Sequence, residues 1–371
     1  MLTLRIAELR KKNNMTQQEL GVLLSVSDRT VSKWENGTVL PDVTMLPKLA
    51  ARFSVSVDAL LGLVPLADDY RPSNSGRREY WAHRVEYLKR TRRAMWNEDY
   101  LRFLVREVWR LEHPVELLDC GCGCGAMGLL LLGLLPPGSR YVGVDFSEEM
   151  LAEARRLFAE SGCSAEFVCA DFWEWKSIRQ YDMVLGQAVL RHVNGGDCFL
   201  KKMISHAKPG GLVVSMECNR EFEADGLYID GMDYAGLCTC SGLKKLWRTE
   251  LAMQNRDYSI AMKIPHYMRK AGLHEVSCRM NDRVNFLCPE QEGYEEMLSD
   301  VIRADHWDDE KTENELEENI AYFMNHGMSR AEAEAYCAQQ NGIVSWLKQH
   351  RGSAALTKFG GILISWGWKA E

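Results

Sequence analysis

The sequence contains no apolar run of the roughly 20 residues that a membrane-spanning helix requires. The longest candidate, GLLLLGLL at residues 128–135, is too short and is followed by Pro136 and Pro137. No apolar core follows the charged start MLTLRIAELRKKNN, so a secretory signal is not expected either. These absences predict a cytoplasmic protein without a membrane partner.

Cysteine is plentiful, with twelve residues, but the spacing that binds metal is missing. Cys120, Cys122 and Cys124 alternate with glycines, so a single residue separates neighbouring cysteines. Zinc knuckles have two residues between paired cysteines, and they need a second matching pair of ligands. A chain without a signal peptide also favours reduced thiols over a disulfide framework. We therefore expect no metal site, and small side chains in this run suit a tightly turned loop.

An excess of positive charge is also absent. The formal net charge of −7 argues against a protein that coats nucleic acid along its whole length. The first 64 residues carry eight Lys or Arg and six Asp or Glu, a net charge of +2, which leaves −9 for the remainder. With 371 residues, two domains are expected. Of the two, the positively charged N-terminal segment is the better suited to an anionic partner.

Residues 1–64 predict five short helices. Thr16 and Glu19 form a capping-box pattern at the second helix, Ser27 caps the third, and Gly37 follows its end. Pro41 and Asp42 are expected to open the fourth helix. A four-residue connection between the second and third helices predicts a helix-turn-helix unit. The segments TQQEL, VSDRTVSKWENG and LAARFSVSVDALLG, with Pro41 between the last two, resemble the Cro/repressor (XRE-like) family of DNA-binding domains.

This resemblance implies that the third helix enters the major groove of double-stranded DNA and that a homodimer reads paired half-sites. Arg29 would reach a guanine edge, Lys33 would reach a base or a phosphate, and Gln17 and Asn36 would contact phosphates. The expected DNA-binding residues are Gln17, Ser27, Asp28, Arg29, Thr30, Lys33 and Asn36. Val31 and Trp34 belong to the core instead. Asp28 is unfavourable beside phosphate, so a module that only dimerises is the alternative.

The segment after this module predicts a linker at residues 65–78, rich in Pro, Ser, Asn and Gly, and then a second domain over residues 79–371. Residues 80–112 have a helical period that breaks near Trp96 and Asn97. Their arginines are compatible with a nucleic-acid surface, but the nearby acids Glu86, Glu98 and Asp99 favour a solvated helix face. Tyr87, Trp96 and Tyr100 fit a helical lid over a ligand of the following domain.

From His113 onward, apolar strands alternate with helices. The expected strands are VELLDCG, RYVGVDFS, AEFVCADF, YDMVLGQAVL and LVVSMECN. This alternation predicts a parallel sheet covered on both faces, with ligands bound at the carboxyl ends of its strands.

The glycine run DCGCGCGAMG at residues 119–128 fits two kinds of cofactor. Gly123, Gly125 and Gly128 match the dinucleotide fingerprint, and Asp145 lies 20 residues beyond Gly125, where a ribose-binding acid belongs. Asp119, however, would repel a pyrophosphate. S-adenosyl-L-methionine (SAM) presents an ammonium group there, so an acid at this position favours SAM.

Residues 113–218 resemble class I SAM-dependent methyltransferases through LLDCGCGCG, VGVDFS, CADFWEW and KPGGLVVSME. The resemblance implies a Rossmann-like seven-stranded α/β domain that converts SAM to S-adenosyl-L-homocysteine (SAH). It assigns Asp119 to the amino-acid moiety, Asp145 to the ribose hydroxyls and Asp171 to the adenine amino group. The remaining cofactor residues are Gly121, Gly123, Gly125, Phe146 near adenine, Phe172 through its backbone, and Gln187 near the methionine end.

The methyl acceptor is expected to be a small molecule. DNA amino-methylases carry an Asn/Asp/Ser-Pro-Pro-aromatic segment after the fourth strand, where this chain reads LGQAVLRHV, and the Pro-Cys of cytosine-C5 enzymes is missing. Insertions at residues 219–272 and 289–352 would select the acceptor, with a sixth strand in LHEVSCRMNDRVNFLC and a seventh in FGGILISWGWK. A thiol site for arsenite methylation, built from Cys198, Cys218, Cys238 and Cys240, fits the spacing poorly.

Residues that follow strand ends supply the catalytic candidates. His192 would be a general base or a structural histidine, Glu217 is the second catalytic candidate, and Asn219 and Tyr228 would bind the acceptor. The activated sulfonium makes proximity alone sufficient in many such enzymes. The sequence thus predicts a small-molecule methyltransferase fused to a sequence-specific DNA-binding module. The alternative is a transcription regulator whose methyltransferase fold senses SAM or a metabolite without turnover.

Overall fold

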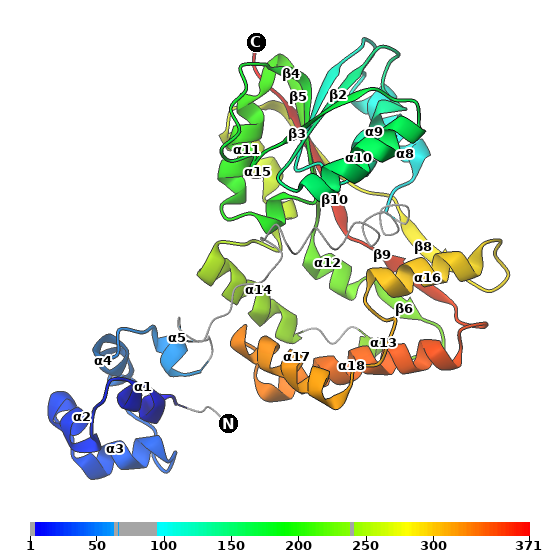
Figure 1. Cartoon of the computed structure of the whole chain (residues 1–371). Helices are drawn as coiled ribbons and strands as arrows, with labels where there is room; N and C mark the ends of the chain where they lie inside the picture. The colour runs from blue at the N-terminus through cyan, green and yellow to red at the C-terminus, as the bar shows by residue number, and fades with distance from the viewer. Residues whose placement is uncertain (1–3, 63–65, 67–94, 238–240) are drawn as a thin grey trace. The chain divides into compact units, whose positions relative to one another are not determined.

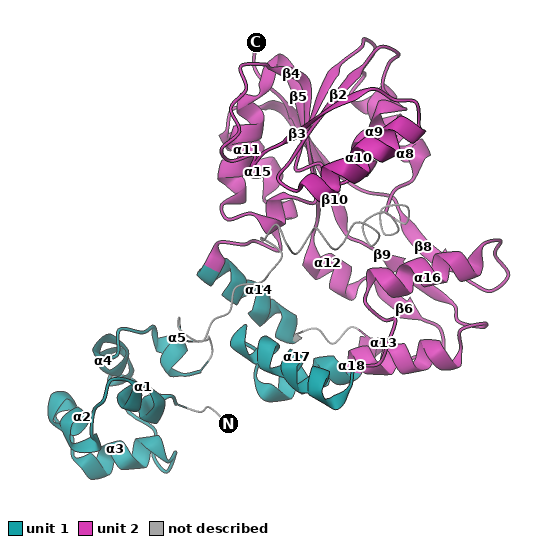
Figure 2. Cartoon of the chain, in the orientation of Figure 1, with its two compact units in different colours: residues 1–72, 241–253, 311–338 teal, residues 73–240, 254–310, 339–371 magenta. Residues whose placement is uncertain are grey.

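The computed structural model describes residues 4–62, 66, 95–237 and 241–371. The predicted linker, apart from Leu66, and residues 80–94 of the predicted lid lie outside this part of the chain. The fold divides into two compact units (Figure 2). The first comprises residues 1–72, 241–253 and 311–338, and the second comprises residues 73–240, 254–310 and 339–371.

The N-terminal part of the first unit contains the five predicted helices (Figure 1). They are α1 (Ile6–Lys12), α2 (Gln17–Leu24), α3 (Asp28–Glu35), α4 (Leu46–Arg52) and α5 (Val57–Leu60). Both predicted helix caps are present, because Thr16 and Glu19 form the reciprocal capping box and Ser27 Oγ accepts from the Thr30 N–H. Val31 and Trp34 lie in the core, as expected.

The fourth helix begins later than the sequence pattern indicated. Pro41 and Asp42 were expected to open it, whereas α4 starts at Leu46. Asp42 instead closes a local turn, since its carboxylate accepts from the Thr44 N–H at 2.8 Å. Pro47 has no N–H and is tolerated only in the first turn of a helix, so it fixes the start at this point.

The second unit contains a seven-stranded sheet of order β3-β2-β1-β4-β5-β10-β7. Its strands are β1 (Glu116–Cys120), β2 (Arg140–Asp145), β3 (Ala165–Cys169), β4 (Tyr181–Gln187), β5 (Ala207–Cys218), β7 (His274–Met280) and β10 (Ile362–Trp368). The first five are parallel, and β10 is antiparallel to both β5 and β7. The first five predicted strands, the predicted seventh strand and the predicted Rossmann-like α/β class are confirmed.

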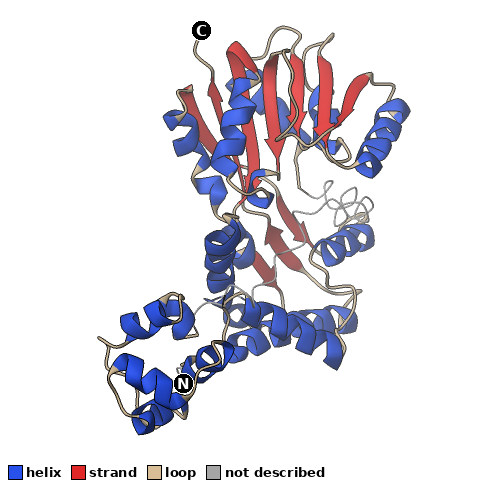
Figure 3. Cartoon of the chain, turned by 60° about the vertical axis from the view of Figure 1, so that its left-hand side comes forward, coloured by secondary structure: helices blue, strands red, loops and turns tan. Residues whose placement is uncertain are grey.

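Helices cover both faces of this sheet (Figures 1 and 3). One face packs α8 (Glu98–Phe103), the π-helical turn at Leu104–Val108, α9 (Ala126–Leu132) and α10 (Glu148–Glu160). The other face packs α11 (Gly196–Ser205), the short turn at Ile260–Met262 and α15 (Ile264–Lys270). The described part of the predicted lid contributes Trp96, Leu101, Leu104 and Trp109 to the first of these cores.

A second sheet, of order β6-β9-β8, was not expected from the sequence. It consists of β6 (Leu227–Ile229), β9 (Leu356–Phe359) and β8 (Val284–Leu287). The predicted sixth strand is therefore two strands, since β7 joins the large sheet and β8 pairs with β9. Asn281 separates them, and its side chain donates to the Met95 carbonyl oxygen at 2.7 Å.

The remaining helices lie after β5. They are α12 (Arg220–Asp225), α13 (Tyr234–Leu237), α14 (Ser241–Gln254), α16 (Tyr294–Ala304), α17 (Glu313–Asn325) and α18 (Arg330–Gln349). Tyr294, Leu298 and Val301 of α16 pack with Ile343 and Val344 of α18 against one face of the small sheet. In the first unit, His326 Nε2 lies 2.9 Å from Glu250 Oε1, and both side chains are fully buried. None of the described helices is long and apolar enough to cross a membrane.

Candidate cofactor site and DNA-binding surface

The glycine run forms the loop between β1 and α9. Gly121, Gly123 and Gly125 all have positive φ, of 73°, 53° and 72°, a backbone conformation that residues with a Cβ rarely adopt. The N–H groups of Gly121 and Cys122 both donate to the Val144 carbonyl oxygen, which fixes the loop on β2. The glycines are therefore required by the backbone, and the alternating cysteines are not.

Gly121 also allows close packing against the loop that follows β4. A Cβ at Gly121 would lie only 2.7 Å from a methyl carbon of Val189. The Asp119-x-Gly121 segment and the residues after β4 thus lie side by side at the carboxyl edge of the sheet. This edge is where open α/β sheets bind their ligands.

Asp119 and Asp145 are the acids that lie beside the glycine loop at this edge. Asp119 lies in β1 and is 2% exposed, and its Oδ2 accepts a hydrogen bond of 2.9 Å from the Tyr141 hydroxyl. Asp145, at the end of β2, accepts from the Gly123 N–H at 2.8 Å and from the Ser147 N–H at 2.9 Å, one on each oxygen. The structure therefore brings both predicted acids to the glycine loop, and Asp145 directly supports it.

The thiols of the run are poor metal ligands. Burial and the negative charge of Asp119 raise the pKa of both Cys120 and Cys122 well above the ordinary thiol value. Metals bind the thiolate form, and a raised pKa disfavours that form. Among the residues with described positions, no three His, Cys, Asp or Glu side chains gather as metal ligands.

Of the residues that the resemblance assigns to adenine, some are exposed and others are buried. Asp171 follows β3, is exposed, and accepts from the Trp173 N–H at 2.9 Å. The Phe172 ring is buried among Trp175, Phe199 and His206, which is compatible with the backbone role that the resemblance implies. Phe146 is partly buried directly after Asp145, and Gln187 is 9% exposed at the end of β4.

Glu217 has a position that sequence reasoning did not anticipate. Its side chain is fully buried, and Oε1 accepts from the N–H groups of Val189 and Leu190, each at 2.7 Å. Ala188 just before them has a positive φ of 55°, an uncommon conformation for a residue other than glycine. The carboxylate therefore holds the turn after β4, which is the same turn that packs on Gly121.

His192 lies in the short 3-10 turn Leu190–His192, between two arginines. Arg191 Nε donates to His192 Nε2 at 3.0 Å, and Arg256 Nη2 lies 3.3 Å from Nδ1. A ring nitrogen that accepts from Arg191 must lose that bond before it can take a proton from an acceptor. Arg256 was missed at the sequence level, because no local pattern links residue 256 to residue 192.

The two predicted acceptor-binding residues lie in different settings. Asn219 is 2% exposed and caps α12, since its Oδ1 accepts from the Glu221 N–H at 2.9 Å. Tyr228, in β6, is 43% exposed and donates to Asp230 Oδ1 at 3.0 Å. Of the four cysteines considered for a thiol site, Cys218 is buried, Cys198 is exposed, and Cys238 and Cys240 lie outside the described residues.

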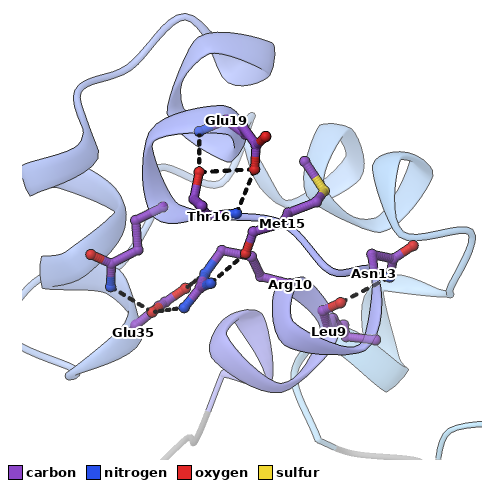
Figure 4. A network of polar contacts seen from close by, with 8 residues as sticks. Leu9, Arg10, Asn13, Met15, Thr16, Glu19 and Glu35 are labelled. Atoms are coloured by element: carbon purple, nitrogen blue, oxygen red, sulfur yellow. Dashed lines mark hydrogen bonds and ion pairs between the residues drawn. The ribbon is translucent and has the colours of Figure 1, made fainter.

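The helix-turn-helix surface is held by a polar network across three helices (Figure 4). Arg10 of α1 makes a two-pronged ion pair with Glu35 of α3, through Nε at 2.6 Å and Nη2 at 3.1 Å. Gln17 of α2 donates to the same carboxylate at 2.8 Å, so this predicted phosphate contact has a partner inside the module. Gly21 lets α2 approach the turn, because a Cβ there would lie 2.8 Å from the Val26 oxygen.

The other predicted DNA contacts lie at the start and along the outside of α3. Ser27, Asp28, Arg29, Lys33 and Asn36 are exposed, and Thr30 is half-buried. Three of them also stabilise the local backbone. Ser27 caps the helix, Asp28 Oδ1 accepts from the Arg29 N–H, and Asn36 Oδ1 accepts from the Thr38 N–H.

Comparison with known families agrees with both halves of this description. A family model described as a helix-turn-helix matches residues 6–60, and one described as a methyltransferase domain matches residues 117–211. The chain therefore contains a helix-turn-helix domain and, later in the sequence, a methyltransferase domain. The matched methyltransferase segment runs from β1 to the start of β5 and so includes the glycine loop and both acids.

The methyltransferase domain has relatives among curated proteins. It is 36% identical over 121 residues to a ubiquinone biosynthesis O-methyltransferase of Bradyrhizobium sp. (strain ORS 278), covering 32% of this chain and 46% of that protein. It is 31% identical over 167 residues to a protein of the same description from Azoarcus sp. (strain BH72), covering 44% and 65%. The chain thus spans roughly half to two thirds of the length of these relatives.

Among solved structures, phosphoethanolamine N-methyltransferase 2 of Haemonchus contortus, in complex with SAM, is 15% identical. The match covers 74% of this chain and 53% of that one, at a TM-score of 0.40. With so low a TM-score, the fold assignment rests on the strand order of the large sheet and on the family match.

Proposed function

We propose that this chain is a cytoplasmic SAM-dependent methyltransferase that acts on a small molecule and binds double-stranded DNA, as a homodimer, through its N-terminal domain. One observation carries the cofactor assignment. The carboxylates of Asp119 and Asp145 lie at the two strand ends that flank the positive-φ glycine loop, and Asp145 accepts from the loop at Gly123. An acid beside the loop suits a ligand with an ammonium group and disfavours a pyrophosphate.

The proposed roles follow from these positions. Asp119 binds the amino-acid moiety, Asp145 binds the ribose hydroxyls, and Asp171 binds the adenine amino group. Asp145 accepts one backbone hydrogen bond on each carboxylate oxygen, which fixes the carboxylate beside the loop. SAM, when bound, supplies an activated methyl group, so the protein needs mainly to align the acceptor with it.

The region after β5 is the proposed acceptor side. It adds the small sheet and the helices α12 and α16, elements beyond the seven strands. His192 and Tyr228 remain our candidates for proton transfer and acceptor contact. Glu217 is better explained as a positioning residue, because its Oε1 already holds the turn after β4. The ubiquinone pathway named for the curated relatives makes hydroxylated aromatic compounds the first acceptors to test.

Two measurements on the full chain test this function. Calorimetry should detect SAH binding, and methyl-labelled SAM with a metabolite extract should yield a labelled small molecule. Asp119→Asn should weaken SAH binding about tenfold or more, because an ionic partner of the ammonium is lost. Asp182→Asn is the matched control. Asp182 lies near the amino end of β4, away from the carboxyl edge of the sheet, and accepts from the Glu116 N–H.

The outcomes separate the alternatives. A native chain that binds neither SAM nor SAH contradicts the proposed function. SAH binding without label transfer, together with operator affinity that changes with SAH, supports a regulator that senses its ligand. The helix-turn-helix module, with its exposed α3 face, is the observation that favours this second function. Label recovered in DNA would instead indicate a DNA methylase.

A further inference from the structure

The Tyr141 hydroxyl donates a hydrogen bond to Asp119, which is more buried than Asp145, the other acid beside the glycine loop. Tyr141 lies in β2, is 1% exposed, and donates to Asp119 Oδ2 at 2.9 Å. Neither the glycine motif nor the resemblance to methyltransferases assigns it a role. The two residues come from neighbouring strands, with Asp119 paired to Gly143 and Tyr141 paired to Leu117.

The protein leaves room for this ring at two glycines. A Cβ at Gly128 would lie 2.0 Å from Tyr141 Cε2, and a Cβ at Gly143 would lie 3.0 Å from Cε1. Real Cβ atoms do not approach so closely, so α9 packs over the ring only because residue 128 is glycine. The Phe158 ring, with its centroid at 4.9 Å, and the Phe167 ring, at 5.8 Å, complete the enclosure.

An enclosed phenol of this kind is a fixed donor. Burial, followed by the negative charge of Asp119, raises the pKa of Tyr141 well above its ordinary value of 10, so the hydroxyl keeps its proton. A neutral donor facing a carboxylate gives a charge-assisted hydrogen bond, which is stronger than a bond between neutral groups. The bond restricts rotation of the carboxylate and thereby fixes the direction of its second oxygen.

We propose that Tyr141 is a positioning residue that orients the Asp119 carboxylate toward the ammonium group of the methionine moiety of SAM. The inference rests on the proposed SAM binding and adds a residue to it. This role also explains why residue 128 is glycine. It admits the ring that positions Asp119, although it lies beyond the loop that approaches the cofactor.

The test compares two ligands of the full chain by calorimetry. SAH carries the amino-acid moiety, whereas 5′-methylthioadenosine has the same nucleoside and sulfur without it. Tyr141→Phe should weaken SAH binding about tenfold, the equivalent of one charge-assisted hydrogen bond, and should change methylthioadenosine binding less than about twofold. A merely structural role would weaken both ligands together.

Two controls make the result specific. Tyr181→Phe removes a hydroxyl from another tyrosine that is 1% exposed in the same sheet, at the start of β4, and should leave both affinities unchanged. In an Asp119→Ala background, Tyr141→Phe should add little further loss of SAH affinity, since the two residues act as a pair. If Tyr141→Phe fails to fold, Tyr141→Met fills the space without a hydroxyl and serves in its place.

Each outcome is decisive. A native chain that binds neither SAH nor methylthioadenosine refutes the proposed cofactor and leaves no role for this pair. Normal binding by the native chain, with equal loss of both ligands in Tyr141→Phe or no loss of either, overturns the positioning role alone. The same holds if the losses from Tyr141→Phe and Asp119→Ala are additive.

Discussion

At the scale of single residues, acidic side chains stabilise the loops of the candidate cofactor site in addition to their proposed contacts with the ligand. Glu217 and Asp145 both accept backbone N–H groups from the turns that build the cofactor site. Such bonds place a charge beside a ligand and fix a loop at the same time. The sequence marks both residues as strand-end acids and does not separate these roles, since a strand-end position is equally compatible with either.

Glu217→Ala is therefore expected to destabilise the fold as well as weaken SAH binding. It leaves the buried N–H groups of Val189 and Leu190 without their acceptor, at a cost of about 1–3 kcal/mol for each buried unsatisfied group. Glu217→Gln retains an acceptor oxygen and should cost less. Chemical denaturation of both variants measures the difference, and equal stability of Glu217→Ala and the native chain would contradict the assignment.

At the scale of elements, the ion pair of Arg10 and Glu35 links α1 to α3 within the helix-turn-helix module. Burial alone would raise the pKa of Glu35, but hydrogen bonds from Arg10 and Gln17 and the charge of Arg10 outweigh it, so the pKa is lowered. The side chains of Arg10 and Glu35 are only 11% and 9% exposed, so solvent screens the pair weakly. The pair therefore stabilises α3 in the arrangement that presents Arg29 and Lys33.

Because the folded-state pKa of Glu35 is lowered, its contribution is complete above the unfolded pKa of about 4.3 and is lost as pH falls through the lower folded value. Glu35→Gln should increase hydrogen exchange in residues 6–35 at pH 7 and should have little effect near pH 2. Mass spectrometry of labelled peptides measures this, with Glu8→Gln, whose contact with Arg5 is 4.0 Å and solvent-accessible, as the control. An equal effect of Glu35→Gln at both pH values would argue against the ion pair.

At the scale of the whole molecule, two sites of different chemistry occur in one chain. The predicted DNA contacts of α3 and the carboxyl edge of the large sheet belong to separate compact units. Any coupling between them must be reciprocal, so a change in operator affinity caused by SAH requires an equal change in SAH affinity caused by the operator.

We expect Arg29→Ala to weaken binding to an operator selected from random duplexes by about fivefold to a hundredfold, because a base contact is worth about 1–3 kcal/mol. SAH affinity should stay unchanged. Conversely, Asp119→Asn should leave operator affinity unchanged. Fluorescence anisotropy and calorimetry on the same preparations measure both. A reciprocal shift of the two affinities would favour the sensing function over independent sites.

The sequence by itself determined the local elements and their order. Thr16, Glu19 and Ser27 specify helix starts through contacts three residues apart, and the alternation of apolar strands and helices specifies a parallel sheet. Gly121, Gly123 and Gly125 indicated the cofactor loop because their conformational requirement is a property of each residue.

Only the tertiary structure decided which residues from distant segments meet. It placed Tyr141 against Asp119, Arg256 against His192, and Glu217 beneath the turn at Val189. It also divided the predicted sixth strand between two sheets. The physical reason is that strand pairing and packing join residues far apart in the chain, and no local periodicity records which partner each will have.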